Sequence, residues 1–417
     1  MPRLTLLLLV IGLGTCVMAL AADSTGSSLE TASSRVYLPL LARGAPIATP
    51  WFLTRGGANT DKAWGVDTDS QGNVYFATYE TVPGPWSDIY LYKFDASGKQ
   101  LWKAQRWGRD WNDQAYVVVV REPYVYVAGR SDATIDFNTA DMAVLAYNIA
   151  DGSLAWSWIG DPGSGYDETD GLVVTTDGIF IAGWTAVPGR SNDLAVGKLS
   201  LDGDLLWRRT WGTAGWDEAN GQIVVTGDTI YVAGKYNGLN ILFGGNAALV
   251  AFDREDGAER WRRTWGAVGS DAYGLIGDAT GLYVVGIDFQ GLNGQIFLRK
   301  FSLSGDPLWD RLWGGAKGEA TRAVEVAEDG SVIVAGKTDS YGAGGNDIVV
   351  VSYSPGGQEQ WSRLWGGAKS DETHGLALHG DTLYIAGETS SYGGVASDAL
   401  LLSGTLSNAT LGTVKVP

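Results

Sequence analysis

Short runs of alternating apolar and polar residues, separated by turns that contain glycine or aspartate, follow one another along most of the chain. One stretch holds four of them: GLVVTTD from Gly171, IFIAGW from Ile179, LAVGKL from Leu194 and LLWRRTW from Leu205. Alternation with a period of two indicates β-strands, so this stretch predicts four strands in succession. Because the same order of runs recurs, the chain is predicted to be built from copies of one four-stranded unit.

A tryptophan in the last strand of each unit measures the repeat. It stands at Trp102, Trp156, Trp207, Trp261, Trp309 and Trp361. Units of about 50 residues with several strands each are typical of propeller blades. First strands of seven units can be counted, near Gly65, Tyr116, Gly171, Gly221, Gly274, Ala323 and Gly375. We therefore predict an all-β fold, a seven-bladed β-propeller of four-stranded blades.

The last unit contains three strands and lacks the tryptophan-bearing fourth strand. The run from Trp51 to Arg55, at the other end of the repeat region, matches that missing strand. We expect this amino-terminal strand to complete the last blade, because such a closure joins the two ends and removes an open sheet edge.

Connections within a unit differ in length. The turns after the first and third strands are short, whereas the other two connections are long and should emerge on one face of the propeller. Binding residues are often found on loops that a rigid scaffold positions, so the long-loop face is the predicted functional face.

The units resemble the bacterial secreted β-propeller repeat family (SBBP), with its D-x-x-V-x-K-x-x-x-x-G-x-x-x-W and G-x-x-x-D-x-x-x-G-x-A elements. The resemblance covers residues 50 to 405. It implies a propeller and a secreted or surface location, and it implies no settled activity.

The amino terminus predicts export. Arg3, the apolar run from Leu4 to Leu13 and the small residues around Leu20 are typical of a secretory signal over residues 1–21. Residues 22–48 read as a Ser/Thr/Ala-rich linker, and residues 49–417 as the propeller. Lipidation at Cys16 is an alternative that the preceding Thr15 disfavours.

Composition narrows the possible partners. The 417 residues include 47 acidic and 30 basic ones, a formal net charge of −17, which repels nucleic acid and anionic membranes. Cys16 is the single cysteine, so the mature chain would have no disulfide and no thiol nucleophile. We expect a monomer that partners a glycan or an extracellular protein, without membrane insertion after signal removal.

One position at the start of each first strand varies while its neighbours repeat. These residues are Trp64, Tyr116, Asp170, Asn220, Tyr273, Arg322 and His374. If the repeat frame is right, they encircle one mouth of the channel and offer the mixed aromatic and polar character of a ligand site. The alternative is that solvent-facing rim positions drift freely.

Aromatic residues in the long connections add a second candidate surface. They are Trp86, Trp111, Tyr166, Trp184 and Trp216. Such rings suit stacking on sugars, and exposed aromatic residues also mark protein contacts.

An acidic residue recurs before each first strand: Asp61, Asp113, Asp167, Asp217, Asp271, Glu319 and Asp371. Repetition in every unit favours a structural role, in which the carboxylate accepts backbone N–H bonds and fixes the turn. Calcium is the alternative, through either Asp167, Glu168 and Asp170 or Asp132, Asp136 and Asp141. We predict no metal and no other cofactor.

Catalytic motifs are missing from the sequence, so we expect a non-catalytic binding module that recognises a glycan or protein through its long-loop face. Nucleophile turns, phosphate loops and zinc-ligand clusters are not found. The repeated tryptophans also resemble those of quinoprotein dehydrogenases, but the eight blades and vicinal cysteines of those enzymes are missing. The enzymatic alternative is a lyase or hydrolase that uses Asp170, Arg322 and His374 at the channel mouth.

Overall fold

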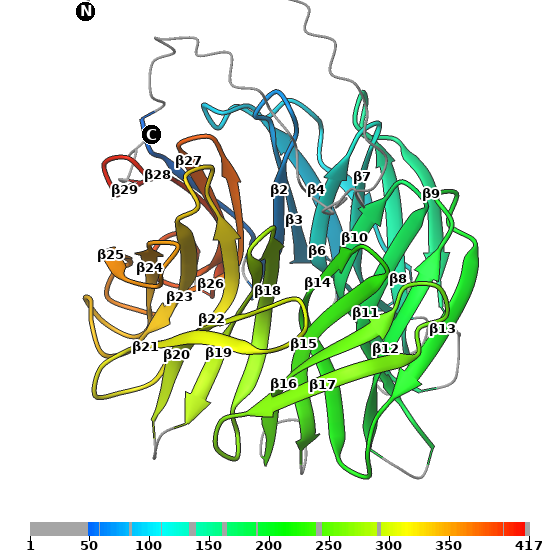
Figure 1. The fold of residues 1–417 in the computed structure, drawn as a ribbon. Coiled ribbons are helices and arrows are strands. Elements are labelled where there is room, and N and C mark those ends of the chain that lie inside the picture. The colour runs from blue at the N-terminus through cyan, green and yellow to red at the C-terminus, as the bar shows by residue number, and fades with distance from the viewer. Residues whose placement is uncertain are drawn as a thin grey trace, which may run out of the picture.

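A computed structural model describes residues 49–412, apart from residues 58, 83–85, 110, 133–138, 161–164, 189–190, 239–243, 290–292 and 395. The predicted signal segment and linker lie outside the described residues. Twenty-nine strands form seven antiparallel sheets arranged around one axis (Figure 1). The predicted seven-bladed propeller is therefore confirmed. Within the described residues there is no helix with the length and hydrophobicity needed to span a membrane.

Each blade consists of four strands, ordered from the axis outward. The inner strands are β2 (Lys62–Thr68), β6 (Asp113–Arg121), β10 (Asp167–Thr175), β14 (Trp216–Thr226), β18 (Asp271–Asp278), β22 (Glu319–Val326) and β26 (Asp371–His379). The second strands are β3 (Val74–Thr81), β7 (Tyr124–Asp132), β11 (Gly178–Ala186), β15 (Thr229–Gly238), β19 (Gly281–Phe289), β23 (Val332–Thr338) and β27 (Thr382–Thr389). The third strands are β4 (Ser87–Phe94), β8 (Ala140–Asn148), β12 (Asn192–Leu199), β16 (Gly244–Asp253), β20 (Gly294–Phe301), β24 (Asp347–Tyr353) and β28 (Asp398–Thr405). The outer strands are β5 (Gln105–Trp107), β9 (Leu154–Ile159), β13 (Leu205–Trp211), β17 (Glu259–Trp265), β21 (Pro307–Trp313), β25 (Glu359–Trp365), and, in the seventh blade, β1 (Phe52–Arg55) with β29 (Thr410–Leu411).

The seventh blade is completed by both ends of the described chain. Strand β1 pairs antiparallel with β28, as predicted, and in Figure 1 it lies in blue beside the red end of the chain. Strand β29, which the sequence did not reveal, pairs with the next residues of β28. The two segments share the outer-strand position, so the ring is closed by two short pieces instead of one.

The hydrophobic core lies between blades. Seven clusters of buried side chains occur, and each joins the second and third strands of neighbouring blades. The cluster between the seventh and first blades contains Trp51, Phe76 and Leu401. Each blade is thus stabilised by the apolar area that its two neighbours bury.

The repeated tryptophans fix each blade to the next. A ring in or just before an outer strand lies against a glycine of positive φ in the following blade, in the turn between the third and fourth strands. The pairs are Trp51 with Gly98, Trp102 with Gly152, Trp156 with Gly203, Trp207 with Gly257, Trp261 with Gly305 and Trp309 with Gly357. Because each such turn holds its glycine at positive φ under a ring, a side chain there would meet both strain and a clash. Trp51 extends this series across the closure, and its Nε1 also donates to the Ala96 carbonyl at 3.0 Å.

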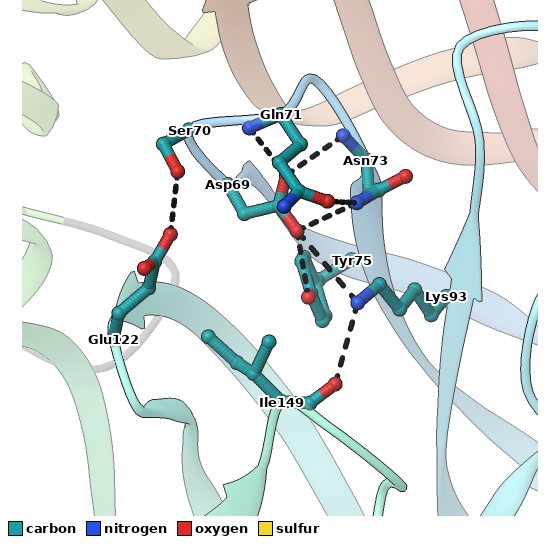
Figure 2. A network of polar contacts seen from close by, with 8 residues as sticks. All are labelled: Asp69, Ser70, Gln71, Asn73, Tyr75, Lys93, Glu122 and Ile149. Carbon is teal, nitrogen blue, oxygen red and sulfur yellow. Dashed lines mark hydrogen bonds and ion pairs between the residues drawn. The ribbon is translucent and has the colours of Figure 1, made fainter.

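The short turns on the opposite face from the long loops are closed by side-chain hydrogen bonds. In the first blade Asp69 accepts hydrogen bonds from the backbone N–H groups of Gln71 and Asn73, each at 2.9 Å, and from the Tyr75 hydroxyl at 3.0 Å (Figure 2). Lys93 lies 3.7 Å from the same carboxylate and donates to the Ile149 carbonyl of the second blade at 3.3 Å. This network links two blades and satisfies the buried charge at its centre.

The repeated acidic residues fix the turns that enter the inner strands. Asp217, for example, accepts backbone N–H bonds from Thr213 at 2.6 Å and Asn237 at 2.8 Å. The prediction that Asp271 fixes this turn in the fifth blade was wrong by one residue. Ser270 occupies the position that the acidic residue has in the other blades, and its hydroxyl donates to Asp288 at 2.7 Å. Asp271 therefore takes the next position on the strand and faces the channel mouth.

Candidate functional site: a chamber at the channel mouth

Every inner strand carries a β-bulge at the same place. The pairing with the second strand skips one residue in six blades, and in the fourth blade it skips the stretch 220–222. In six blades the skipped residue is the variable one, and in the fourth blade the variable residue is the first of the three skipped. These residues are Trp64, Tyr116, Asp170, Asn220, Tyr273, Arg322 and His374. A bulge kinks its strand and re-aims a side chain, which explains why these positions vary while their neighbours repeat.

Glycines in the second strands make room for the bulges. A Cβ on Gly183 would overlap the carbonyl oxygen of Glu168, and the equivalent glycines of the other blades are equally crowded: Gly129, Gly234, Gly286, Gly336 and Gly387. The first blade is the exception, with Thr78 at this position. The repeated Ala-Gly pairs of the sequence are thus a signal of the bulge.

A chamber of about 310 Å³ opens where the bulged residues converge. Its lining comprises Trp64, Gln114, Tyr116, Glu168, Asp170, Trp184, Glu218, Asn220, Lys235, Asp271, Tyr273 and Arg322. A smaller cavity of about 60 Å³ shares several of these residues and extends between the inner strands. Six of the seven predicted mouth residues therefore line one chamber, which is open to solvent.

His374, the seventh, lies behind the chamber. Its ring stacks on Trp64 with centroids 4.2 Å apart and an interplanar angle of 12°, and its Nε2 lies 3.4 Å from Glu388. Burial lowers the pKa of His374, although Glu388 acts in the opposite direction. The imidazole positions the Trp64 ring and is not among the groups that line the chamber.

Carboxyl groups gather on the side formed by the third, fourth and fifth blades. Glu168 accepts hydrogen bonds from Trp184 Nε1 at 2.9 Å and from the Tyr166 hydroxyl at 3.1 Å. Burial raises the pKa of Glu168 to about 7, and Arg130 only partly offsets this effect. A carboxyl group in this state can take up or release a proton near neutral pH.

The neighbouring carboxyl groups are less well paired. Asp271 accepts two 3.1 Å bonds from the Asn220 amide, and burial raises its pKa to about 6. Burial and the charge of Glu168 raise the pKa of Asp170, whose Oδ2 is buried without a hydrogen-bond partner. Glu218 Oε2 lies 3.1 Å from Lys235 Nζ, whereas Glu218 Oε1 is buried and accepts no hydrogen bond of good geometry. Burial raises the pKa of Glu218, although Lys235, Asn220 and Asn192 oppose this effect.

Arg322 provides the positive side of the chamber. Its guanidinium carbon lies 4.3 Å from the centre of the Tyr273 ring and 5.0 Å from that of Trp64. These cation–π contacts hold the side chain in place. Among the described residues Arg322 makes no ion pair within 4.0 Å, so its N–H groups remain available to a ligand in the chamber.

The predicted loop aromatics are more buried than expected. Trp184 belongs to strand β11, is 6% exposed and stacks on Tyr166 at 4.8 Å. Trp86 and Trp111 pack edge to face at 4.2 Å, and Trp216, the first residue of β14, is half-buried. Trp184 thus joins the chamber, and the other four are half-buried, so their role as a loop-face surface stays a prediction.

One group of side chains has the spacing to bind a metal ion, and it differs from both predicted calcium sites. Among the described residues, Glu372, His374 and Glu388 alone bring three ligand atoms within 4.8 Å of one another. Lys62 and Lys337 already pair with Glu388 at 2.7 Å and Glu372 at 2.9 Å, so positive charge is present there. Asp136 lies outside the described residues, and calcium stays untested.

Comparisons with known proteins agree with the fold. The family model described as outer membrane protein assembly factor BamB matches residues 192–351, less than half of the chain. Among solved structures, the WD40 β-propeller domain of Doa1 has a TM-score of 0.52 at 10% identity, covering 85% of this chain and 97% of that domain.

The extracellular domain of a putative hybrid two-component system from B. thetaiotaomicron has a TM-score of 0.47 at 13% identity. The alignment covers 84% of this chain and 39% of that one. A search of curated proteins finds no match. The resemblance to the secreted repeat family stays a prediction, because the matching model describes a different family.

Proposed function

We propose that the chain is a secreted, non-catalytic binding module that takes the end of a glycan into the chamber at the channel mouth. The observation that carries this proposal is the chamber itself, whose aromatic rings and hydrogen-bonding groups face one space of about 310 Å³. This volume lies near the lower end of the roughly 300–1,000 Å³ typical of ligand pockets. Secretion rests on the signal pattern of residues 1–21.

The chemistry of the lining suits a sugar. Tyr116, Tyr273 and Trp64 supply rings for the apolar faces of a pyranose, while Asn220 and Arg322 supply donors for its hydroxyl oxygens. A flat protein surface would not enter a chamber of this size. A protein partner is therefore the alternative for the surrounding loops, and the match to an assembly-factor family over residues 192–351 is what favours it.

A second candidate function is hydrolysis or elimination on the bound glycan. Its specific support is Glu168, since a carboxyl group with a pKa of about 7 can act as a general acid or base. His374, one of the three residues named for the enzymatic alternative, stacks on Trp64 and does not line the chamber. An assay of product release with Glu168→Gln as control separates this function from binding alone.

A glycan-array screen of the full chain, with and without calcium, tests the proposal. We expect specific binding that Trp64→Ala abolishes and that Trp216→Ala leaves within about twofold, because Trp216 does not line the chamber. Equal loss in both variants would move the site to the wider loop face. No binding under either condition would overturn the proposal.

A further inference from the structure

The carboxyl groups around the chamber outnumber the positive charges by one. Four carboxyl side chains line it: Glu168, Asp170, Glu218 and Asp271. Three cations face them, since Lys235 and Arg322 line the same space and Arg130 acts on Glu168 from behind. With every group ionised, the described residues of the site are therefore one positive charge short.

Two carboxylate oxygens show where that charge is missing. Glu218 is 2% exposed and lines the chamber, yet its Oε1 accepts no hydrogen bond of good geometry, although the Asn220 and Asn192 amides lie near enough to oppose the effect of burial on its pKa. Asp170 Oδ2 is also buried and unpartnered on the adjacent blade. Leaving a buried carboxylate oxygen without a donor is unfavourable, so both atoms are suited to accept hydrogen bonds from a ligand.

The spacing of the carboxyl groups does not suit a metal ion. Among the described residues, no three of the lining carboxylates bring ligand atoms within 4.8 Å of one another. A donor group that reaches separate acceptors fits better, and an ammonium group has three N–H bonds that point in different directions.

Arg322 places a positive charge on one side of the chamber. It comes from the sixth blade, whereas Asp170 and Glu218 come from the third and fourth. A ligand with one cationic group and several neutral oxygen atoms would place the cation by the two carboxylates. Its oxygen atoms would then accept hydrogen bonds from Arg322 and Asn220.

We propose that the glycan bound in this chamber carries a free, protonated amine, as a hexosamine does, and that Asp170 and Glu218 accept its N–H bonds. This inference rests on the proposed function and names the class of sugar. The aromatic rings and Arg322 select a sugar ring, and the two carboxylates select the amine.

Proton release should accompany binding. Burial raises the pKa values of Glu168 to about 7 and of Asp271 to about 6, and it also raises those of Asp170 and Glu218. The charged groups that face them are Arg130, Lys235 and Arg322. An added cation favours the ionised carboxylates and lowers these pKa values, so protons leave as the amine binds.

The test is titration calorimetry of the full chain at about pH 6, where an amine of ordinary pKa is protonated. The probes are oligomers of glucosamine, of N-acetylglucosamine, of glucose and of galacturonic acid. We expect the glucosamine oligomer to bind at least about tenfold more tightly than the others, with net proton release in buffers of different ionisation enthalpy.

Matched variants locate the selectivity. Asp170→Asn changes a side chain whose Oδ2 has no hydrogen-bond partner among the described residues, so it should remove most of the preference for the amine. Glu218→Gln should do the same. Glu359→Gln, an identical change on an exposed outer strand, should have no effect. Circular dichroism checks that each variant is folded.

The outcomes separate the two claims. If a neutral or acidic oligomer binds more tightly than the glucosamine oligomer and Trp64→Ala abolishes that binding, the proposed recognition of an amine is wrong and the proposed glycan site stands. Failure of every oligomer to bind would overturn both. A preference for the amine that survives in Asp170→Asn and Glu218→Gln would overturn the assignment to these residues.

Discussion

Asp69 and Asp170 both have buried carboxylate oxygen atoms, but they lie at opposite ends of the inner strands. Asp69 accepts hydrogen bonds from three neighbouring residues (Figure 2), whereas Asp170 Oδ2 has no partner. Burial by itself acts to raise the pKa of both carboxyl groups, but the net shifts differ in direction. For Asp69 the hydrogen bonds from Asn73, Tyr75 and Gln71 outweigh burial and lower the pKa, whereas for Asp170 the charge of Glu168 raises it further.

The same contrast separates repeated from varied positions. Trp261 and Gly305 belong to a docking pattern that recurs around the outer part of the ring, where it fixes blade to blade. The bulged residues share a backbone geometry but differ in side chain from blade to blade. Asp69 is satisfied by its own turn and is structural, whereas the unpartnered Oδ2 of Asp170 lines the chamber, where a ligand can donate to it.

Removing the closure should give the largest effect. Deletion of residues 50–57 takes away β1 and the Trp51 contact with Gly98. We expect the free energy of unfolding to fall by at least about 4 kcal/mol, because a docked strand and a buried ring are lost together. Differential scanning calorimetry measures it, with deletion of residues 25–32 as the matched control. Identical melting curves for both deletions would contradict the closure.

Neutralising the two aspartates sharpens the contrast directly. Asp69→Asn should lower the free energy of unfolding by about 2–3 kcal/mol, since it disrupts a satisfied network and leaves Lys93 without its charged partner. Asp170→Asn should leave stability unchanged or raise it slightly, because it removes an unsatisfied buried charge. Urea denaturation measures both. Equal destabilisation would show that Asp170 has a structural partner after all.

A change in the bulge itself should couple stability to the chamber. Gly183→Ala places a Cβ against the Glu168 carbonyl, so the strands must separate and Asp170 must move. We expect a loss of about 1–3 kcal/mol in the free energy of unfolding together with loss of ligand binding. Gly197→Ala, in the same blade but with its nearest atoms at 3.3 Å, is the control. Retained binding in Gly183→Ala would mean that the bulge does not position the site.

Stability should depend on pH through the chamber. Glu168 has an ordinary pKa of 4.5 and a pKa of about 7 in the folded protein, so the folded state binds more protons between these values. Its contribution is fully present below pH 4.5 and is lost as the pH rises through 7, by about 1–3 kcal/mol. In thermal melts recorded between pH 4.5 and pH 7, the melting temperature of Glu168→Gln should depend less on pH than that of the unchanged protein. An unchanged slope would contradict the assignment.

Much of this architecture could be predicted because it repeats. The spacing of Trp102 to Trp361, the seven first strands and the strand after Trp51 predicted blade number and closure correctly. Strand β29 could not be predicted, because two residues are too few to show an alternating pattern. Asp271 was placed one residue out of register, since a one-residue slip reverses which face of a strand a side chain occupies.

The chamber could be predicted only in part. The variable positions identified six lining residues, but Glu168, Glu218 and Lys235 enter the chamber only through the register between first and second strands. His374 stacks on Trp64 and pairs with Glu388, and it does not line the chamber. Such side-chain choices depend on neighbouring blades, which a single repeat does not encode.

The most direct test of the account is a crystal structure of the full chain soaked with the oligosaccharide that the array selects. We predict density for a sugar within the chamber, in contact with Arg322 and with the unpartnered oxygen atoms of Asp170 and Glu218. Density on the outer strands or over the loops, with the chamber holding only water, would contradict the central claim.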